Sequence, residues 1–399
     1  MGQTILLTLG RLPKGLELAR CLHSAGHRVL VADPFGWHLS KPSRAVARSI
    51  QVPAPAIDQT AYLEALASIA RDEQVDLVIP VSEEVMHVSL LAGRLPARTR
   101  LFCPPHDALL TLHDKYAFAR QAAESGLRTP ETCLGDDPAA ATLAARTDTV
   151  AKARFGCSGA GLHFLDPGAA LSPDLLTSDW VIQQRIHGRE ASTLSFCRDG
   201  DILAHVVYRG LILSGTVAVA FERIELAPVD AWVRDFVAAA GYSGFIAFDF
   251  IVDDSDEPWP LECNPRLTSG VHFLDHGDLA EVVTGAALGR AVRIKPQARF
   301  QEGHTALTMA YAKILQPKRF GSMLKTIATT RDVLWSLNDP LVFPMMTPMS
   351  WPILKQVMFE GRSFGEAATL DIEWRPDAEP AAELSGAAPA QPGTLEASA

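Results

Sequence analysis

Two apolar runs flank a short polar loop: GFIAFDFIVD at residues 244–253 and PWPLECNPR at residues 258–266, with DSDE between them. Strand-forming residues on both sides of a four-residue polar loop predict a β-hairpin. The strand patterns around it, over about residues 180–264, indicate a mostly antiparallel α+β unit. The acids inside the two runs make this hairpin the most informative part of the sequence.

The expected pairing brings charged side chains together. If Asp253 pairs with Pro258, Asp249 lies directly across from Glu262, and Asn264 lies diagonal to Asp249. Because side chains alternate between the two faces of a strand, these three polar groups share one face. Directly opposed Cβ atoms are about 4.5–5.5 Å apart, so the two carboxylates would repel each other.

A divalent cation would turn this repulsion into attraction. Asp249, Glu262 and Asn264 all offer hard oxygen ligands, which suit Mg²⁺ or Mn²⁺ rather than zinc. Mg²⁺ held by one or two carboxylates usually shares its coordination sphere with nucleotide phosphates. Arg266 is then placed to hold a transferring phosphoryl group. The alternative is an exposed sheet face with solvated acids.

Two lysines and a flexible loop support a nucleotide site. Lys152 lies on the small apolar strand TVAKAR at 149–154, directly before the Gly/Ser loop GCSGAG at 156–161, which contains Ser158 and Gly159. A lysine on such a strand needs an anionic partner, and the loop offers backbone N–H groups to phosphate. Lys115, which starts a helix after Asp114, is either a second phosphate ligand or a solvated side chain.

Taken in order, these residues resemble the ATP-grasp superfamily, most closely its carbamoyl-phosphate-synthetase-like branch. The matching pieces cover roughly residues 110–270 and end on the Glu-x-Asn-Pro-Arg motif at 262–266. The resemblance implies an ATP clamped between two α+β subdomains. It assigns the phosphates to Lys115 and Lys152, the adenine hinge to Gln183, Gln184 and Ile186, the ribose to Glu190, and Mg²⁺ to Asp249, Glu262 and Asn264.

The resemblance also implies an activity. The family phosphorylates a carboxylate to an acyl phosphate, which an amine or thiol attacks, and ADP and phosphate leave. Arg266 and Lys152 would be the catalytic residues, and small-molecule acids and amines the substrates. One departure is Ala153-Arg154, where many members have proline, so Arg154 is expected to point into the cleft. A single grasp module without a glutaminase region argues against carbamoyl-phosphate synthesis as the reaction.

The rest of the chain divides around this region. Strand and helix patterns alternate over the first part, which predicts a doubly wound parallel sheet of the pre-ATP-grasp kind. The expected fold class is therefore α/β and α+β, a parallel-sheet domain followed by a two-subdomain ATP-grasp fold. The expected boundaries are 1–110, 111–295 with subdomains 111–185 and 186–295, a C-terminal extension packed on the core over 296–375, and a disordered tail over 376–399.

Composition excludes several classes. The net charge is −10, and no run of Lys or Arg exceeds a pair, so nucleic acid is not an expected partner. The six cysteines form no CxxC, which argues against a disulfide framework or a Cys-rich zinc site. No stretch approaches the roughly 18 apolar residues of a membrane span, and no signal peptide is expected, because the first ten residues lack a basic n-region. A cytoplasmic protein is expected, and the oligomeric state stays open, with a homodimer as one option.

Other interpretations stay open. A nucleotide-binding regulatory protein without turnover would keep the same clamp. The loop at 10–15 followed by Asp33 loosely suggests an NAD-dependent oxidoreductase, although the spacing is not G-x-G-x-x-G. Arg209 and His272 are candidate substrate contacts, and His272 with His276 is a weaker zinc candidate. Prolines at every fourth position over 340–352 exclude a continuous helix and predict an irregular segment over the core; the alternative is a partner surface or lid.

Overall fold

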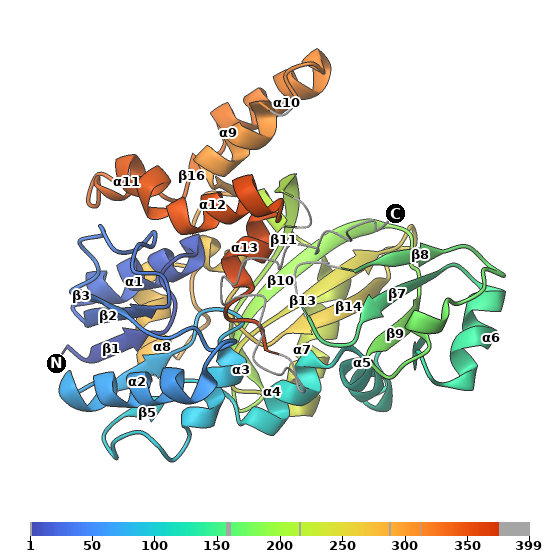
Figure 1. Ribbon diagram of the computed structural model, residues 1–399, viewed down its shortest axis with the longest axis horizontal. Coiled ribbons are helices and arrows are strands. Elements are labelled where there is room, and N and C mark those ends of the chain that lie inside the picture. Colours follow the sequence, from blue (N-terminus) through green and yellow to red (C-terminus); the bar gives the residue numbers. More distant parts are fainter. Residues whose placement is uncertain (1, 157–160, 215–216, 287–288, 312, 375–399) are drawn as a thin grey trace, which may run out of the picture.

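The computed structural model describes residues 2–156, 161–214, 217–286, 289–311 and 313–374 (Figure 1). Ser158, Gly159 and the stretch 376–399 lie outside these residues. The described residues form one parallel sheet and two largely antiparallel sheets with helices packed on them, which confirms the predicted fold class of a parallel-sheet domain followed by α+β units.

The N-terminal unit is a parallel sheet of five strands in the order β3-β2-β1-β4-β5. Its elements are β1 (Thr4–Leu7), α1 (Pro13–Ser24), β2 (Arg28–Asp33), β3 (Arg48–Gln51), α2 (Gln59–Asp72), β4 (Leu77–Ile79), α3 (Val85–Val88), η1 (Ser89–Leu91) and β5 (Arg100–Leu101). A parallel sheet is buried on both faces, so successive residues of β1 enter different cores. Ile5 and Leu7 pack with α1, whereas Leu6 packs with α2.

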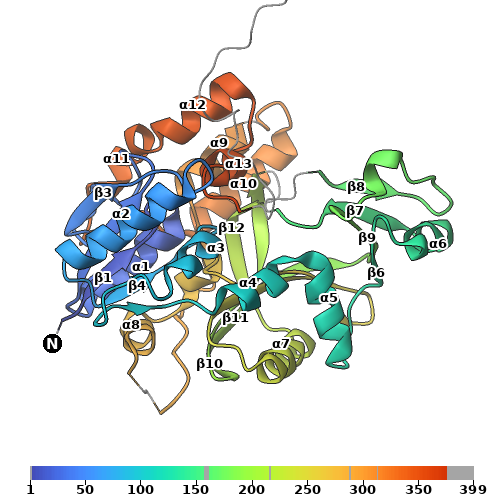
Figure 2. The same cartoon turned by 60° about the horizontal axis from the view of Figure 1, so that its bottom comes forward.

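Two helices lead from this unit to a small sheet, as Figure 2 shows. They are α4 (His106–His113) and α5 (Lys115–Glu124), and Asp114 caps α5 as predicted, accepting from Tyr116 and Ala117 N–H. The small antiparallel sheet has the order β6-β9-β7-β8. Its elements are β6 (Thr132–Leu134), α6 (Pro138–Arg146), β7 (Thr149–Ala153), β8 (His163–Leu165), η2 (Pro173–Leu175) and β9 (Trp180–Gln184).

The large sheet has seven strands in the order β14-β13-β10-β11-β12-β15-β16. Its elements are β10 (Arg189–Arg198), β11 (Asp201–Ser214), β12 (Val217–Ile224), α7 (Ala227–Ala240), β13 (Gly244–Val252), β14 (Pro258–Asn264), η3 (Ser269–Phe273), α8 (His276–Thr284), β15 (Arg299–Gln301) and β16 (Arg331–Asp332). An aromatic core packs α7 against β13, with Trp232 and Phe236 in contact with Phe248. This core takes one face of β13; on the other face Phe245 and Ala247 pack into a second apolar core, and Asp249 follows them.

The predicted hairpin is present as β13 and β14. Asp249 pairs with Glu262, and Ala247 pairs with Asn264, so the predicted opposition of the two acids is confirmed. Because Phe248 and Phe250 occupy the aromatic core, alternation sends Asp249 to the opposite face.

The tip of the hairpin differs from the prediction. Asp253 does not pair with Pro258; instead Val252 does, and a bulge in the ladder leaves Leu261 without a partner strand residue. The Asp253 carboxylate accepts from two backbone N–H groups of the turn and from the Trp259 indole, which holds it in the turn. The bulge then restores the register that opposes the two acids.

The C-terminal extension is helical. Its helices are α9 (Gly303–Tyr311), α10 (Pro317–Thr329), α11 (Val342–Met349), α12 (Trp351–Glu360) and α13 (Phe364–Thr369). The expectation of an irregular segment over the prolines is therefore wrong, although the helix does break at Ser350. Pro352 stands in the first turn of α12, where no N–H is needed, and Pro348 stands one residue before α11 ends.

None of the helices in the described part of the chain is both long enough and apolar enough to cross a membrane.

Candidate active site

One cavity of about 1240 Å³ lies between the N-terminal unit, the two antiparallel sheets and the end of the C-terminal extension. Eight of the predicted site residues line it: Lys115, Lys152, Glu190, Arg209, Asp249, Glu262, Asn264 and Arg266. Residues that are distant in the sequence therefore meet at one site, and most of the predicted phosphate and metal ligands are among them.

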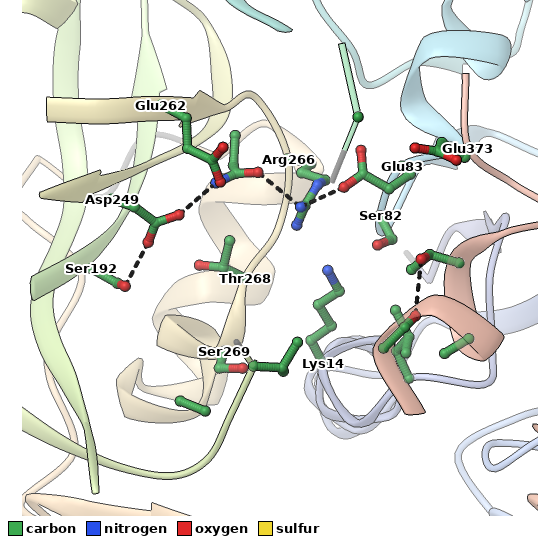
Figure 3. Close-up of a pocket in the computed structure, with 18 of the residues that line it drawn as sticks. Lys14, Ser82, Glu83, Ser192, Asp249, Glu262, Arg266, Thr268, Ser269 and Glu373 are labelled. Atoms are coloured by element: carbon green, nitrogen blue, oxygen red, sulfur yellow. Dashed lines mark hydrogen bonds and ion pairs between the residues drawn. The ribbon is translucent and has the colours of Figure 1, made fainter. Parts of the chain in front are cut away.

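The two acids of the hairpin face this cavity (Figure 3). Asp249 Oδ1 accepts from the Ser192 hydroxyl at 2.6 Å, and Asp249 Oδ2 accepts from Asn264 Nδ2 at 2.9 Å. Burial and the opposed charge of Glu262 raise the pKa of Asp249 to about 6. Burial would also raise the pKa of Glu262, but Lys115, Lys152 and Arg266 bring it below its ordinary value.

Two lysines approach the same acids. Lys115 Nζ lies 3.6 Å from Glu262 Oε2 and donates to the Gly156 carbonyl at 2.9 Å. Lys152 Nζ donates to the Leu261 carbonyl at 3.2 Å. Burial lowers the pKa of Lys152 to about 8, against the opposing effect of Glu262. The charges at this end of the cavity are therefore only partly balanced, and a ligand carrying both a cation and phosphates would complete them.

Arg266 joins the hairpin to the N-terminal unit. Its Nη2 lies 2.5 Å from Glu83 Oε1 and also donates to Asn264 Oδ1 at 2.8 Å. Burial would raise the pKa of Glu83, but Arg266 and His113 lower it to about 2. Sequence reasoning missed Glu83, although it had a signal: Glu83 follows β4 at the carboxyl end of a central parallel strand, where ligand sites of such sheets form.

Lys14 and helix α13 were also missed. Lys14 Nζ donates to the Leu267 carbonyl at 2.8 Å, and Figure 3 shows its side chain pointing toward Thr268 and Ser82. Seven residues in and directly after α13 line the cavity as well: Phe364, Gly365, Ala368, Thr369, Leu370, Glu373 and Trp374. A buried arginine holds this segment in place, because Arg11 Nη1 lies 2.6 Å from Asp371 Oδ1. Their separation of 360 positions explains why no local pattern in the sequence indicated the contact.

The predicted adenine hinge does not line this cavity. The Gln183 side chain is buried and donates to Thr132 Oγ1 at 3.0 Å, away from the cavity. The Gln184 N–H donates to the Glu131 carbonyl, which extends the pairing of β9 with β6. Ile186, just beyond β9, is likewise not among the lining residues. Its role with Gln183 and Gln184 stays a prediction from the resemblance.

Three further predictions meet different outcomes. Arg209 lines the cavity, but its guanidinium already pairs with Glu222 at 2.8 Å. His272 is buried between Phe221 and Phe300, with Nδ1 3.4 Å from Glu17 Oε2, so it packs in the core and does not contact the cavity. Arg154 does not point into the cleft, because it pairs with the helix-capping Asp114 at 2.6 Å.

The backbone N–H groups of the loop that suggested NAD binding are hydrogen-bonded within the protein. Gly10 and Arg11 donate their backbone N–H groups to Asp33 Oδ2 at 2.9 and 3.0 Å, and the Arg11 guanidinium contacts the same carboxylate. In a dinucleotide fold these N–H groups would face phosphate and the acid would face ribose. Here the N–H groups and the carboxylate bind each other, which argues against the oxidoreductase interpretation of this loop.

The donor set at the hairpin fits a metal only together with a ligand. Within the described residues, no group of three or more His, Cys, Asp or Glu side chains is placed to hold a metal ion. Two carboxylates and one amide are too few for a closed protein cage. They match the way Mg²⁺ is held when phosphates and waters supply its remaining ligands.

The family comparison agrees with this geometry. Residues 112–270 match the sequence profile described as the ATP-grasp domain, and the chain therefore contains an ATP-grasp domain over these residues. A comparison with curated proteins finds no match.

Solved structures share the fold at low sequence identity. N5-carboxyaminoimidazole synthetase from Staphylococcus aureus with ADP gives a TM-score of 0.58 at 17% identity, covering 74% of this chain and 80% of that one. The biotin carboxylase domain dimer of 2-oxoglutarate carboxylase from Hydrogenobacter thermophilus, with MgADP and bicarbonate, gives 0.60 at 13%, covering 74% and 73%. L-amino acid ligase from Bacillus licheniformis gives 0.53 at 15%, covering 71% and 74%.

Proposed function

We propose that the chain is an ATP-dependent ligase that activates a carboxylate as an acyl phosphate for attack by an amine. The observation that carries this proposal is the convergence of Lys115 and Lys152, the opposed acids Asp249 and Glu262, and Arg266 on one cavity. A carboxylate is a poor electrophile, and phosphorylation gives it a leaving group. The protein's task in such a transfer is positioning and charge neutralisation, which these side chains are suited to perform.

Each group has a role in this proposal. In the first step a substrate carboxylate oxygen bonds to the terminal phosphorus of ATP, and ADP leaves. Lys115 and Lys152 neutralise the phosphates, and Arg266 holds the transferred group. Asp249, Glu262 and Asn264 would hold Mg²⁺, which supplies further charge neutralisation when bound. In the second step the amine attacks the acyl carbon and loses a proton, and phosphate leaves.

The structural neighbours support the general class of reaction. Among them are a carboxyaminoimidazole synthetase crystallised with ADP and an L-amino acid ligase. They support ATP-dependent ligation in general and leave the acid and the amine to be identified. The alternative is a regulatory protein that binds the nucleotide without turnover. Arg266 and Asn264, which such a protein would not need, are both present.

Trapping the acyl phosphate tests the proposal without knowledge of the amine. The full chain is incubated with ATP, Mg²⁺, a panel of small carboxylic acids and hydroxylamine, which converts an acyl phosphate to a hydroxamate. We expect acid-dependent ADP release together with the hydroxamate. Nucleotide binding in a thermal-shift assay without ADP release from any acid would favour the regulatory alternative.

A matched pair of variants locates the chemistry. Glu262→Gln should lower ADP release at least about 100-fold, because it removes one of the two carboxylates that would hold Mg²⁺ against the phosphates. Glu257→Gln, in the exposed turn of the same hairpin, should leave the rate unchanged. An undiminished rate in Glu262→Gln would remove the metal assignment.

A further inference from the structure

Helices α9 and α10 form a hairpin that stands out from the body of the molecule, as Figure 1 shows. The turn between them is held by its backbone: Ile314 N–H donates to the Tyr311 carbonyl at 3.0 Å, and Gln316 N–H donates to the Lys313 carbonyl at 2.8 Å. Pro317 then opens α10 in its first turn. The helical hairpin therefore ends in a compact, convex turn.

The side chains at this turn are apolar and exposed. Leu315 is 94% exposed, and Tyr311 and Ile314 are each more than half exposed. We call these three residues the hairpin tip. Scattered single apolar residues on a surface are ordinary, but three together at the most projecting turn indicate a site that meets an apolar phase. By contrast, Met323 and Ile327 of α10 pack against the large sheet, so the base of the hairpin is anchored.

The formal charges along the helical hairpin have one sign. Residues 303–331 contain no Asp or Glu, in a chain whose net charge is −10. The same stretch carries five basic residues: Lys313, Lys318, Arg319, Lys325 and Arg331. Each of the five is exposed, and none forms an ion pair with another described residue. Lys313, Lys318 and Arg319 lie in or directly after the turn, whereas Lys325 and Arg331 lie closer to the base of the helical hairpin. Basic side chains beside exposed apolar ones favour an anionic partner that also accepts aliphatic groups.

We propose that the α9–α10 hairpin docks the protein on an anionic lipid surface, with the hairpin tip entering the boundary between headgroups and acyl chains. Aliphatic and aromatic residues on one side and Lys/Arg on the other are the composition of peripheral membrane elements. The convex shape favours a bilayer over a folded protein, because lipids can surround a projecting turn whereas a protein partner would need a matching groove. This docking is independent of the ligase chemistry.

Vesicle flotation with the full chain tests the proposal. We expect binding to phosphatidylcholine vesicles that contain about 30% phosphatidylglycerol, much weaker binding to pure phosphatidylcholine, and a fall in binding as salt rises. The double variant Ile314→Ser/Leu315→Ser should lower the partition coefficient at least about tenfold. Lys318→Gln/Arg319→Gln should lower it about tenfold and flatten its salt dependence.

Matched controls use exposed residues elsewhere. Leu176→Ser, in the small-sheet subdomain, and Arg71→Gln/Arg94→Gln, in the N-terminal unit, should bind like wild type. The proposal is overturned by absence of binding to anionic vesicles, by equal binding to the neutral ones, or by an equal loss in the controls. Self-association of the chain, or capture of polyglutamate, that depends on the tip while vesicles do not bind would assign the surface to a second copy or an acidic polypeptide instead.

Discussion

Two groups of buried charges differ in how completely their members are paired within the protein. In the first, the Arg11 guanidinium lies between the carboxylates of Asp33 and Asp371, with ion-pair distances of 2.8 and 2.6 Å. In the second, Asp249 and Glu262 oppose each other, and the charge of Lys152 is shared between these two carboxylates. The first group fixes the fold because its charges are satisfied internally; the second retains capacity for a ligand.

The paired group should give the largest change in stability. Arg11→Leu leaves two buried carboxylates without their shared cation, so we expect a loss of about 3–5 kcal/mol in the free energy of unfolding. Urea denaturation followed by circular dichroism measures it. A loss below about 1 kcal/mol would show that the cluster does not anchor the C-terminal segment.

The unbalanced group should respond in the opposite direction. Asp249→Asn removes one of two opposed charges while keeping the size of the side chain. We therefore expect the free energy of unfolding of the ligand-free chain to rise by about 1–2 kcal/mol at pH 8. The pKa of Asp249 is raised above its unfolded value, so its ionisation costs stability as pH rises from about 4 to about 6. The gain should therefore vanish near pH 4. A destabilised variant at pH 8 would contradict the repulsion.

The affinity for Mg²⁺·ADP should follow a bell-shaped pH profile, with an acidic and a basic limb. Affinity should rise toward pH 6 as Asp249 loses its proton, and fall above pH 8 as Lys152 loses its charge, with about a tenfold change per pH unit on each limb. Isothermal titration calorimetry across this range measures both. In Lys152→Arg the upper limb should disappear, because arginine stays charged. A flat profile in wild type would refute the assignment of both groups.

An exposed ion pair provides the baseline. Arg120 and Glu124 lie one turn apart on α5, with Nη2 2.8 Å from Oε1 and both side chains in solvent. Such pairs contribute little to stability, so Arg120→Gln should leave the unfolding midpoint unchanged within error. A clear shift would mean that burial is not what distinguishes the Arg11 cluster from surface ion pairs.

Local patterns in the sequence predicted the hairpin and its acids well. Alternation along β13 placed Asp249 on the polar face, and the register opposed it to Glu262. The same reasoning failed at the turn between β13 and β14, where the Asp253 side chain closes the turn and Val252 takes its place opposite Pro258. A bulge at Leu261 then shifts the register back by one residue. The alternation of apolar and polar residues cannot reveal a one-residue shift at the turn that a later bulge cancels. The prediction of the acid pair was therefore right although its starting pair was wrong.

Contacts between distant segments were not predictable in the same way. The wall formed by α13 depends on Arg11 meeting Asp371, and no spacing rule connects two such positions. His272 shows the converse: its proximity in sequence to Arg266 suggested a site residue, but η3 turns it into an aromatic core. Proximity along the chain indicates a shared site only when the backbone keeps both side chains on one face.

Arg266 has a consequence for how the two ends of the cavity influence each other. One guanidinium nitrogen serves both Asn264, on the hairpin, and Glu83, on the N-terminal unit. A ligand that draws this nitrogen toward one of them weakens its hold on the other. Thermodynamic linkage then makes the effect mutual: whatever factor one ligand applies to the affinity of the second, the second applies to the first.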